Sequence, residues 1–165
     1  MSDTKEEIFC PACKTKMTKI KTSIGINVDV CSEGCGGIWF DNRELEKFDE
    51  NSENIDDIQK VLYGKTFLNV DKDNVRYCPV CNAKMVKHQP SKDCEIEIDE
   101  CYSCGGKFLD YGELDKIRAS KNEFEEQVNK FVKAMYNNPS SNSPFRANEA
   151  TVKTFLKSVY TNHLK

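Results

Sequence analysis

The chain of 165 residues contains nine cysteines, and eight of them form two sets of two close pairs. The first set reads C-x₂-C and, seventeen residues later, C-x₃-C; the second reads C-x₂-C and, nineteen residues later, C-x₂-C. Corresponding cysteines of the two sets lie 68 to 70 residues apart, and such a regular spacing indicates an internal duplication. The sets are Cys10, Cys13, Cys31 and Cys35, then Cys78, Cys81, Cys101 and Cys104.

The similarity of the two copies extends beyond their cysteines. Shared positions are Pro11 and Pro79, Met17 and Met85, Gly36-Gly37 and Gly105-Gly106, and the motif Asp41-x-x-Glu44-Leu45 repeated as Asp110-x-x-Glu113-Leu114. Between the cysteine pairs, apolar residues alternate with polar ones over 24–30, which is typical of a half-buried strand, and Ile96 and Ile98 repeat that pattern.

The order of residues in each copy has a physical explanation. Two close pairs on tight turns direct four sulfurs at one point, and we expect the glycines to let the backbone curl around a metal ion. A short strand leaves the turn, and Asp41 and Asp110 are predicted to cap a following helix. Glu44 and Glu113 stand at the position that completes a capping box.

Closely paired cysteines in a chain without an export signal indicate metal binding or redox chemistry. All-sulfur tetrahedral sites suit zinc or iron, and four protein ligands leave no open position for an activated water molecule. Zinc is therefore favoured, and zinc hydrolase chemistry is disfavoured. Three alternatives remain open: rubredoxin-like iron, a thiol redox pair of the C-P-x-C type, and disulfides.

Three residues near the quartets have competing interpretations. Cys94, the ninth cysteine, falls on the apolar face of the second strand and is interpreted as a small hydrophobic residue. His88 is interpreted as a surface loop residue, because both quartets are already complete. Trp39 has two interpretations that the sequence leaves open, an exposed recognition residue or a core residue.

Charge and composition restrict the function classes. The chain has 24 basic and 27 acidic residues, for a net charge of −3. Four thiolates around a divalent ion add −2, so two filled sites bring the net charge to about −7. A general polyanion-binding protein is normally more basic. Residues 117–165 are the exception, with eight Lys or Arg against four Glu.

The segments outside the copies are expected to be largely helical. In the linker 50–75, Ile55, Ile58 and Leu62 predict a short amphipathic helix that ends at Gly64, and "TFLNV" suggests a strand. After the second copy we predict a longer helix, a break over 137–144, and a final helix. Their apolar stripes are expected either to pack on each other and the ribbons or to bind a partner.

The motif order C-P-x-C, Met, alternating strand, C-x₂₋₃-C-G-G and Asp-x-x-Glu-Leu resembles the transcription factor IIB-type zinc ribbon of small bacterial and phage proteins. The resemblance covers 8–49 and 76–117, about half of the chain. It implies three short antiparallel strands on two zinc knuckles in each copy. It also implies that the eight paired cysteines bind two Zn²⁺ ions.

We therefore expect a small metal-stabilised α+β protein with zinc ribbon 1 at 8–49, a linker at 50–75, zinc ribbon 2 at 76–117 and a helical segment at 118–165. The favoured function is a non-catalytic zinc-binding adaptor for a protein partner, with a link to transcription suggested by the resemblance. Nucleic-acid binding is the second candidate and a redox protein the third. The opening "MSDTKEE" has no secretory leader and no run reaches the roughly 18 apolar residues of a membrane helix, so we expect a cytoplasmic protein.

Overall fold

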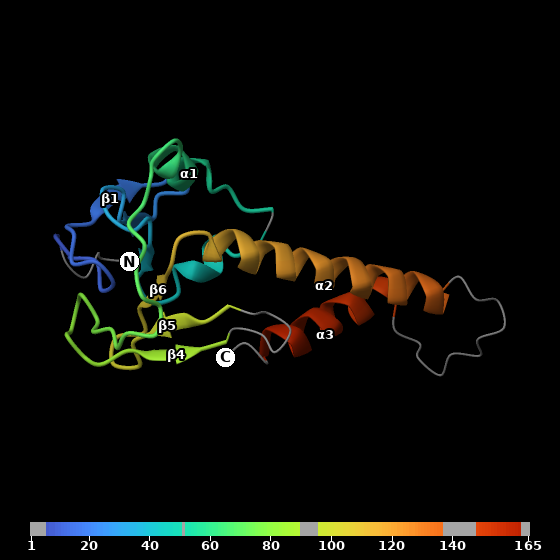
Figure 1. The fold of residues 1–165 in the computed structure, drawn as a ribbon. Helices are drawn as coiled ribbons and strands as arrows, with labels where there is room; N and C mark the ends of the chain where they lie inside the picture. Colours follow the sequence, from blue (N-terminus) through green and yellow to red (C-terminus); the bar gives the residue numbers. More distant parts are fainter. Residues whose placement is uncertain (1–5, 51, 90–95, 137–147, 163–165) are drawn as a thin grey trace.

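The computed structural model describes residues 6–50, 52–89, 96–136 and 148–162 (Figure 1). The first copy forms β1 (Thr18–Lys21), β2 (Asn27–Val30), β3 (Ile38–Phe40) and the 3₁₀ turn η1 (Leu45–Lys47), and the linker forms α1 (Asp56–Leu62). The second copy forms β4 (Val86–His88), β5 (Ile98–Glu100) and β6 (Lys107–Leu109), followed by α2 (Glu113–Tyr136) and α3 (Glu149–Asn162). The predicted α+β class is confirmed.

The strands of both copies form one continuous antiparallel sheet in the order β1-β2-β3-β6-β5-β4. Each copy contributes a three-stranded meander, and the meanders join where β3 pairs with β6. In that pair Trp39 lies opposite Phe108, its counterpart in the duplication. Equivalent residues that pair with each other define a local twofold relation, so the two ribbons associate as the subunits of a symmetric dimer do.

The two faces of the sheet carry different parts of the core. Alternate residues of a strand point to opposite faces. Ile38 and Phe40 face one apolar cluster with Phe48, Ile58 of α1 and Leu114 of α2. On the other face, Trp39 and Phe108 pack with the buried cysteines and with Met17 and Met85. Helical segments therefore cover one face of the sheet, and the cysteine-bearing turns cover the other.

The second glycine of each Gly-Gly pair makes room for an aromatic ring of the other ribbon. A Cβ atom added at Gly106 would lie 2.1 Å from Cζ2 of Trp39, and one added at Gly37 would lie 2.3 Å from Cζ of Phe108. The first glycines, Gly36 and Gly105, have positive φ values of 74° and 77° and do provide the expected backbone freedom. Our expectation for the glycines is thus correct for the first of each pair only.

Trp39 is a core residue, with 1% of its surface exposed. It belongs to a row of side chains that crosses all six strands: Lys19, Asp29, Trp39, Phe108, Asp99 and Lys87. The row has the same order of residue types from either edge of the sheet: lysine, aspartate, aromatic. Each lysine forms an ion pair with the aspartate beside it, Lys19 with Asp29 at 2.8 Å and Lys87 with Asp99 at 3.2 Å. The interpretation of Trp39 as an exposed recognition residue is therefore wrong.

The ribbons differ in the group that binds the aspartate after the third strand. In the first ribbon, Trp39 Nε1–H donates to Asp41 Oδ1 at 2.9 Å. In the second ribbon the aromatic residue is Phe, which has no N–H, and Arg76 lies with Nη2 2.9 Å from Asp110 Oδ1. The position of Arg76 is occupied by Ile8 in the first ribbon. Two substitutions between the copies thus compensate each other.

Arg76 is the centre of a buried ionic cluster. Only 1% of its surface is exposed, and its Nη1–H donates to Asp99 Oδ2 at 2.7 Å. Its guanidinium also lies over the ring of Phe108, 5.1 Å from the centroid. The Asp110 carboxylate therefore pairs with Arg76 instead of capping the helix as predicted. Only the reciprocal half of the capping box is present, where the Asp110 N–H donates to Glu113 Oε2 at 2.7 Å.

The same motif starts helices of very different length in the two copies. After Asp41 the chain forms only η1, because Phe48 turns into the core and packs on Phe40 with ring centroids 5.7 Å apart. After Asp110 it forms α2, a helix of 24 residues. The predicted linker helix is present as α1, whereas "TFLNV" is not a strand.

The helix α2 begins on the sheet and continues beyond it as an arm, with α3 lying antiparallel alongside (Figure 1). Its first turns are fixed by Arg118, which donates to the carbonyl oxygens of Phe48 and Glu53 at 2.6 Å and 2.8 Å. Farther along, Val128 and Val132 are buried. Phe131 and Phe155 of the arm remain 57% and 64% exposed.

The contact between Trp39 and Gly106 generates the first prediction. Gly106→Ala is expected to lower the free energy of unfolding by about 1–3 kcal/mol, because the methyl group overpacks the join between the ribbons. In a Trp39→Leu background the same change is expected to cost less, as urea denaturation of the four proteins would measure. Gly25→Ala is the control for background dependence: its added Cβ would meet nothing within 4 Å, so the cost of its positive φ of 81° should be the same in both backgrounds. An equal cost of Gly106→Ala in both backgrounds would contradict the proposed contact.

The ionic cluster generates the second prediction. Asp110→Ala is expected to lower the free energy of unfolding by about 3–5 kcal/mol, because it leaves the buried Arg76 guanidinium without one of its partners. Asp115→Ala, an exposed change in the first turn of the same helix, is expected to cost about 0.3–1 kcal/mol. Chemical denaturation would compare them, and similar small losses would mean that Asp110 acts only through the helix dipole.

Candidate metal centres

The structure brings the predicted cysteines together as two separate quartets. In each quartet all four sulfurs lie within 4.8 Å of one another. In the first quartet Cys13 Sγ lies 3.3 Å from Cys31 Sγ, and Cys10 Sγ lies 3.5 Å from Cys35 Sγ. In the second quartet the Sγ atoms of Cys81 and Cys101 are 3.4 Å apart, and those of Cys78 and Cys104 are 3.6 Å apart. All eight are free cysteines in this structure.

Each C-x₂-C pair lies on a turn, and the two turns share a backbone hydrogen bond and a residue with positive φ. The N–H of Lys14 donates to Cys10 O at 2.9 Å, and the N–H of Asn82 donates to Cys78 O at the same distance. Lys14 and Asn82 both adopt positive φ, 64° and 60°. In the second turn, the N–H groups of Val80 and Cys81 point at Cys78 Sγ from 3.4 Å. Donors directed at a sulfur favour its thiolate form.

Electrostatic coupling among the thiols also favours a bound cation. Hydrogen bonds from Cys10 and Cys35 lower the pKa of Cys31 to about 4, and the same network raises the pKa of Cys10. A hydrogen bond from the backbone of Ala83 lowers the pKa of Cys81 to about 6. Each quartet therefore contains a thiolate near neutral pH, which would attract a divalent ion.

The donor set and its dimensions fit zinc. Tetrahedral coordination with Zn–S bonds of about 2.3 Å places the sulfurs about 3.8 Å apart. The observed separations, from 3.3 Å to less than 4.8 Å, bracket that value. Each quartet could therefore hold one Zn²⁺ ion, and its four cysteines would complete the coordination sphere. A bound ion would join the two turns of each ribbon.

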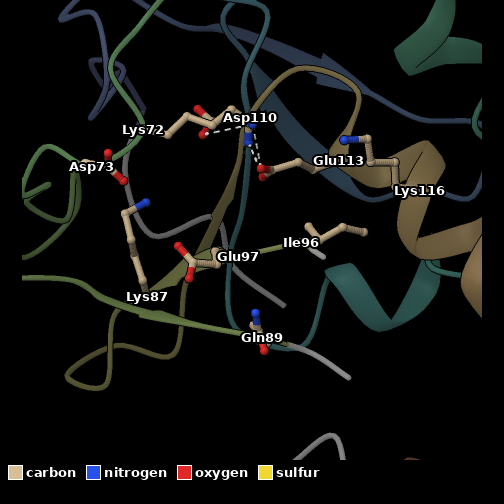
Figure 2. Close-up of a pocket in the computed structure, with 9 residues that line it drawn as sticks. All are labelled: Lys72, Asp73, Lys87, Gln89, Ile96, Glu97, Asp110, Glu113 and Lys116. Atoms are coloured by element: carbon tan, nitrogen blue, oxygen red, sulfur yellow. Dashed lines mark hydrogen bonds and ion pairs between the residues drawn. The ribbon is translucent and has the colours of Figure 1, made fainter. Parts of the chain in front are cut away.

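A polar pocket of about 290 Å³ is lined by residues of the linker, the second ribbon and α2, none of them a cysteine (Figure 2). The side chains of Lys72, Asp110 and Glu113 meet at one side of it, with Lys72 Nζ 2.9 Å from Glu113 Oε1. Its described lining contains lysines and carboxylates but no histidine, cysteine or hydroxyl side chain. Lys72 lies 3.8 Å from Asp110 Oδ2 as well, so it bridges two carboxylates at the start of α2.

Two other expectations concern residues near the quartets. His88 lies in β4 rather than in a loop, with Nδ1 3.1 Å from Glu100 Oε2, and burial lowers its pKa. Cys94 lies outside the described residues. Two residues have roles that were not predicted: Arg76, and Thr15, whose hydroxyl oxygen lies 3.3 Å from Cys13 Sγ.

Two four-cysteine centres on short antiparallel strands define the chain as a double zinc-ribbon protein. A family model described as transcription factor zinc-finger matches residues 9–50 and 77–120, more than half of the chain. The chain therefore belongs to the transcription factor zinc-finger family, in two tandem copies. Comparison with curated proteins and with solved structures found no match. Among the described residues, no helix is long and apolar enough to span a bilayer.

The chemistry of the quartets generates a pH prediction. Zinc binds thiolates, so the folded, zinc-loaded chain holds fewer protons than the unfolded chain, whose thiols titrate near 8.5. Stability therefore rises with pH between about 5 and 8. Urea denaturation of the loaded protein at several pH values, at fixed total zinc, would measure this. A midpoint that does not change across this range would contradict zinc as the main link between the turns.

Proposed function

We propose that this protein is a non-catalytic adaptor in which two zinc ribbons form a rigid base and the α2–α3 arm binds a protein partner. The main supporting observation is the exposure of Phe131 and Phe155 on an arm that projects from the sheet (Figure 1). Family membership supports the zinc-organised base. The family description suggests a partner in the transcription apparatus.

Helical spacing places the two phenylalanines on the same side of the arm. Phe131 follows the buried Val128 by three residues, and Phe155 follows the half-buried Val152 by three. In an antiparallel helix pair, two residues that each follow an inward-facing residue of their own helix by the same number of positions lie on the same side of the pair. Residues three or four positions away on that flank are exposed and uncharged: Gln127, Ala134, Thr151 and Ser158. We call these four and the two phenylalanines the arm strip.

The composition around the arm strip indicates the chemistry of its partner. Residues 117–165 have eight basic and four acidic side chains, in a chain whose overall charge is negative. An uncharged aromatic strip within a basic segment suits an amphipathic segment with an apolar face and acidic flanks. Aromatic anchors of this kind commonly dominate the binding energy of an interface.

Nucleic-acid binding is the second candidate, and a different observation favours it. Phe9 and Tyr77 occupy equivalent positions beside the two quartets and are 57% and 48% exposed. Each forms an antiparallel bridge with a lysine, Lys16 and Lys84 respectively. Exposed rings that alternate with basic side chains are typical of surfaces that stack on single-stranded bases.

Affinity capture of the zinc-loaded full chain from its own cell extract would test both candidates. Replacing Phe131 and Phe155 together by Ser is expected to weaken the captured protein complex by about 2 kcal/mol or more. Tyr63→Ser, which alters an 89% exposed ring outside the arm, is the control and should leave capture unchanged.

Treatment with nuclease separates the candidates. A complex that survives nuclease and depends on the arm phenylalanines supports the adaptor. Capture that is lost on nuclease treatment, together with direct binding to single-stranded nucleic acid that falls steeply with salt, would instead support the second candidate. Capture that survives nuclease but ignores the Phe131 and Phe155 changes would exclude the arm as the binding surface.

A further inference from the structure

The two quartets differ in how the rest of the chain covers them. In the first quartet Cys10, Cys31 and Cys35 are buried and Cys13 is half-buried. In the second quartet Cys81 is exposed and Cys104 is half-buried. Tyr102 and Ser103, between the last two cysteines, are exposed as well. The two centres are therefore related by duplication but unequal in their access to solvent.

One cause is a segment of the linker that passes over the first quartet. We call residues 65–70 the strap. The N–H of Leu68 donates to Gly34 O at 2.9 Å, and Lys65 Nζ pairs with Glu33 Oε1. The Phe67 ring packs against Tyr111, with centroids 4.6 Å apart. The strap thus joins the turn between Cys31 and Cys35 to the exit of the second ribbon.

The strap also lies directly against the backbone of that turn. A Cβ atom added at Gly36 would lie 2.9 Å from Cγ of Phe67 and 2.9 Å from Cδ2 of Tyr111. The equivalent residue in the second ribbon is Gly105, where an added Cβ would meet only the side chain of Asn42 within 3.0 Å. Two aromatic rings thus lie against the first turn at the position where Asn42 lies against the second.

A second cause is the extra residue in the first turn, C-x₃-C against C-x₂-C. A Cβ atom at Gly34 would lie 2.6 Å from Cys31 Sγ and 2.7 Å from Cys13 Sγ, so the backbone of Gly34 itself shields two sulfurs. It would also lie 2.8 Å from the hydroxyl oxygen of Thr15. The second ribbon has Ala83 in place of Thr15 and cannot supply that hydroxyl group.

From these differences we propose that the second quartet is the exchangeable metal site of the chain, and that the strap retains the ion of the first. A chelator or a competing thiolate can reach the ion only by displacing one of the cysteine sulfurs that hold it. Cys81 is exposed, so its sulfur can be displaced from solvent. Exchange at this site transfers the ion between ligands and needs no change of oxidation state. The sheet and its helical face remain supported by the first centre during exchange.

The zinc-loaded full chain tests this proposal. Mixing with an excess of a chromophoric chelator is expected to release one equivalent of zinc rapidly and a second at least about tenfold more slowly. Native mass spectrometry at intermediate times would then show a one-zinc species. Release of both equivalents at one rate would overturn the proposal.

Variants assign the two phases. Cys81→Ser is expected to abolish the fast phase and to leave one slowly released ion. Phe67→Ala is expected to accelerate the slow phase at least about tenfold, since neighbours of a metal site commonly change its affinity 10- to 100-fold. Tyr63→Ala, an exposed change two residues before the strap, should leave both phases unchanged.

Two further results distinguish a loss of folding from a loss of protection of the first metal ion. The far-ultraviolet circular dichroism of loaded Phe67→Ala should match the wild-type spectrum, and Thr15→Ala should also accelerate the slow phase. Acceleration of the fast phase by Phe67→Ala, or survival of the fast phase in Cys81→Ser, would place the exchangeable ion in the first quartet and overturn the assignment. None of these measurements depends on the arm or on its partner.

Discussion

The joining of the two ribbons through β3 and β6 is the constraint on which the rest of this structure depends. A ribbon of about 40 residues buries too little apolar surface to fold without further support, which a metal ion or a second ribbon can supply. Pairing the third strands doubles the sheet and gives Trp39 and Phe108 a place between the quartets. It also creates one continuous surface for helices on the opposite face, where residues from both ribbons form a single apolar cluster. Each metal centre takes its ligands from one ribbon only. Because the sheet is shared, each centre nevertheless stabilises both ribbons.

Different parts of this arrangement were accessible from sequence to different degrees. The quartets could be predicted because a metal site needs fixed residue types at short spacings, and the duplication made Cys10 and Cys78 recognisable as equivalents. The joined sheet could not be predicted, because no spacing in the sequence specifies that β3 pairs with β6. The clearest sign of the joined sheet in the sequence is the second glycine of each Gly-Gly pair. We attributed these glycines to backbone freedom, but Gly37 and Gly106 make room for an aromatic ring of the other ribbon. Cys94 falls outside the described residues, and its interpretation stays a prediction.

The buried charges illustrate a second limit of single-residue interpretation. Asp110 in the pattern Asp-x-x-Glu is a good helix cap by local rules. Its actual partner, Arg76, is distant in sequence and lies two residues before the first cysteine pair of the same copy. The signal lay in comparing the copies: Ile8 becomes Arg76 where Trp39 becomes Phe108, so a lost indole N–H is replaced by a guanidinium N–H. A buried aspartate requires such a donor, and its need explains why both positions change together.

The asymmetry of the molecule follows from what the chain does after each capping motif. In the first copy the apolar stripe ends at Phe48, and the following polar residues allow the chain to turn back through α1 and across the first quartet. In the second copy apolar residues continue at helical spacing through Ile117, Val128 and Val132, so α2 leads the chain away from the second quartet. This difference has two consequences. It creates a projecting arm with an exposed aromatic strip, and it places the strap over the turn of Cys31 and Cys35 in the first ribbon. Helix length therefore adds to the effect of the extra residue at Gly34 in making one centre more covered than the other, and duplication alone would not have produced this difference.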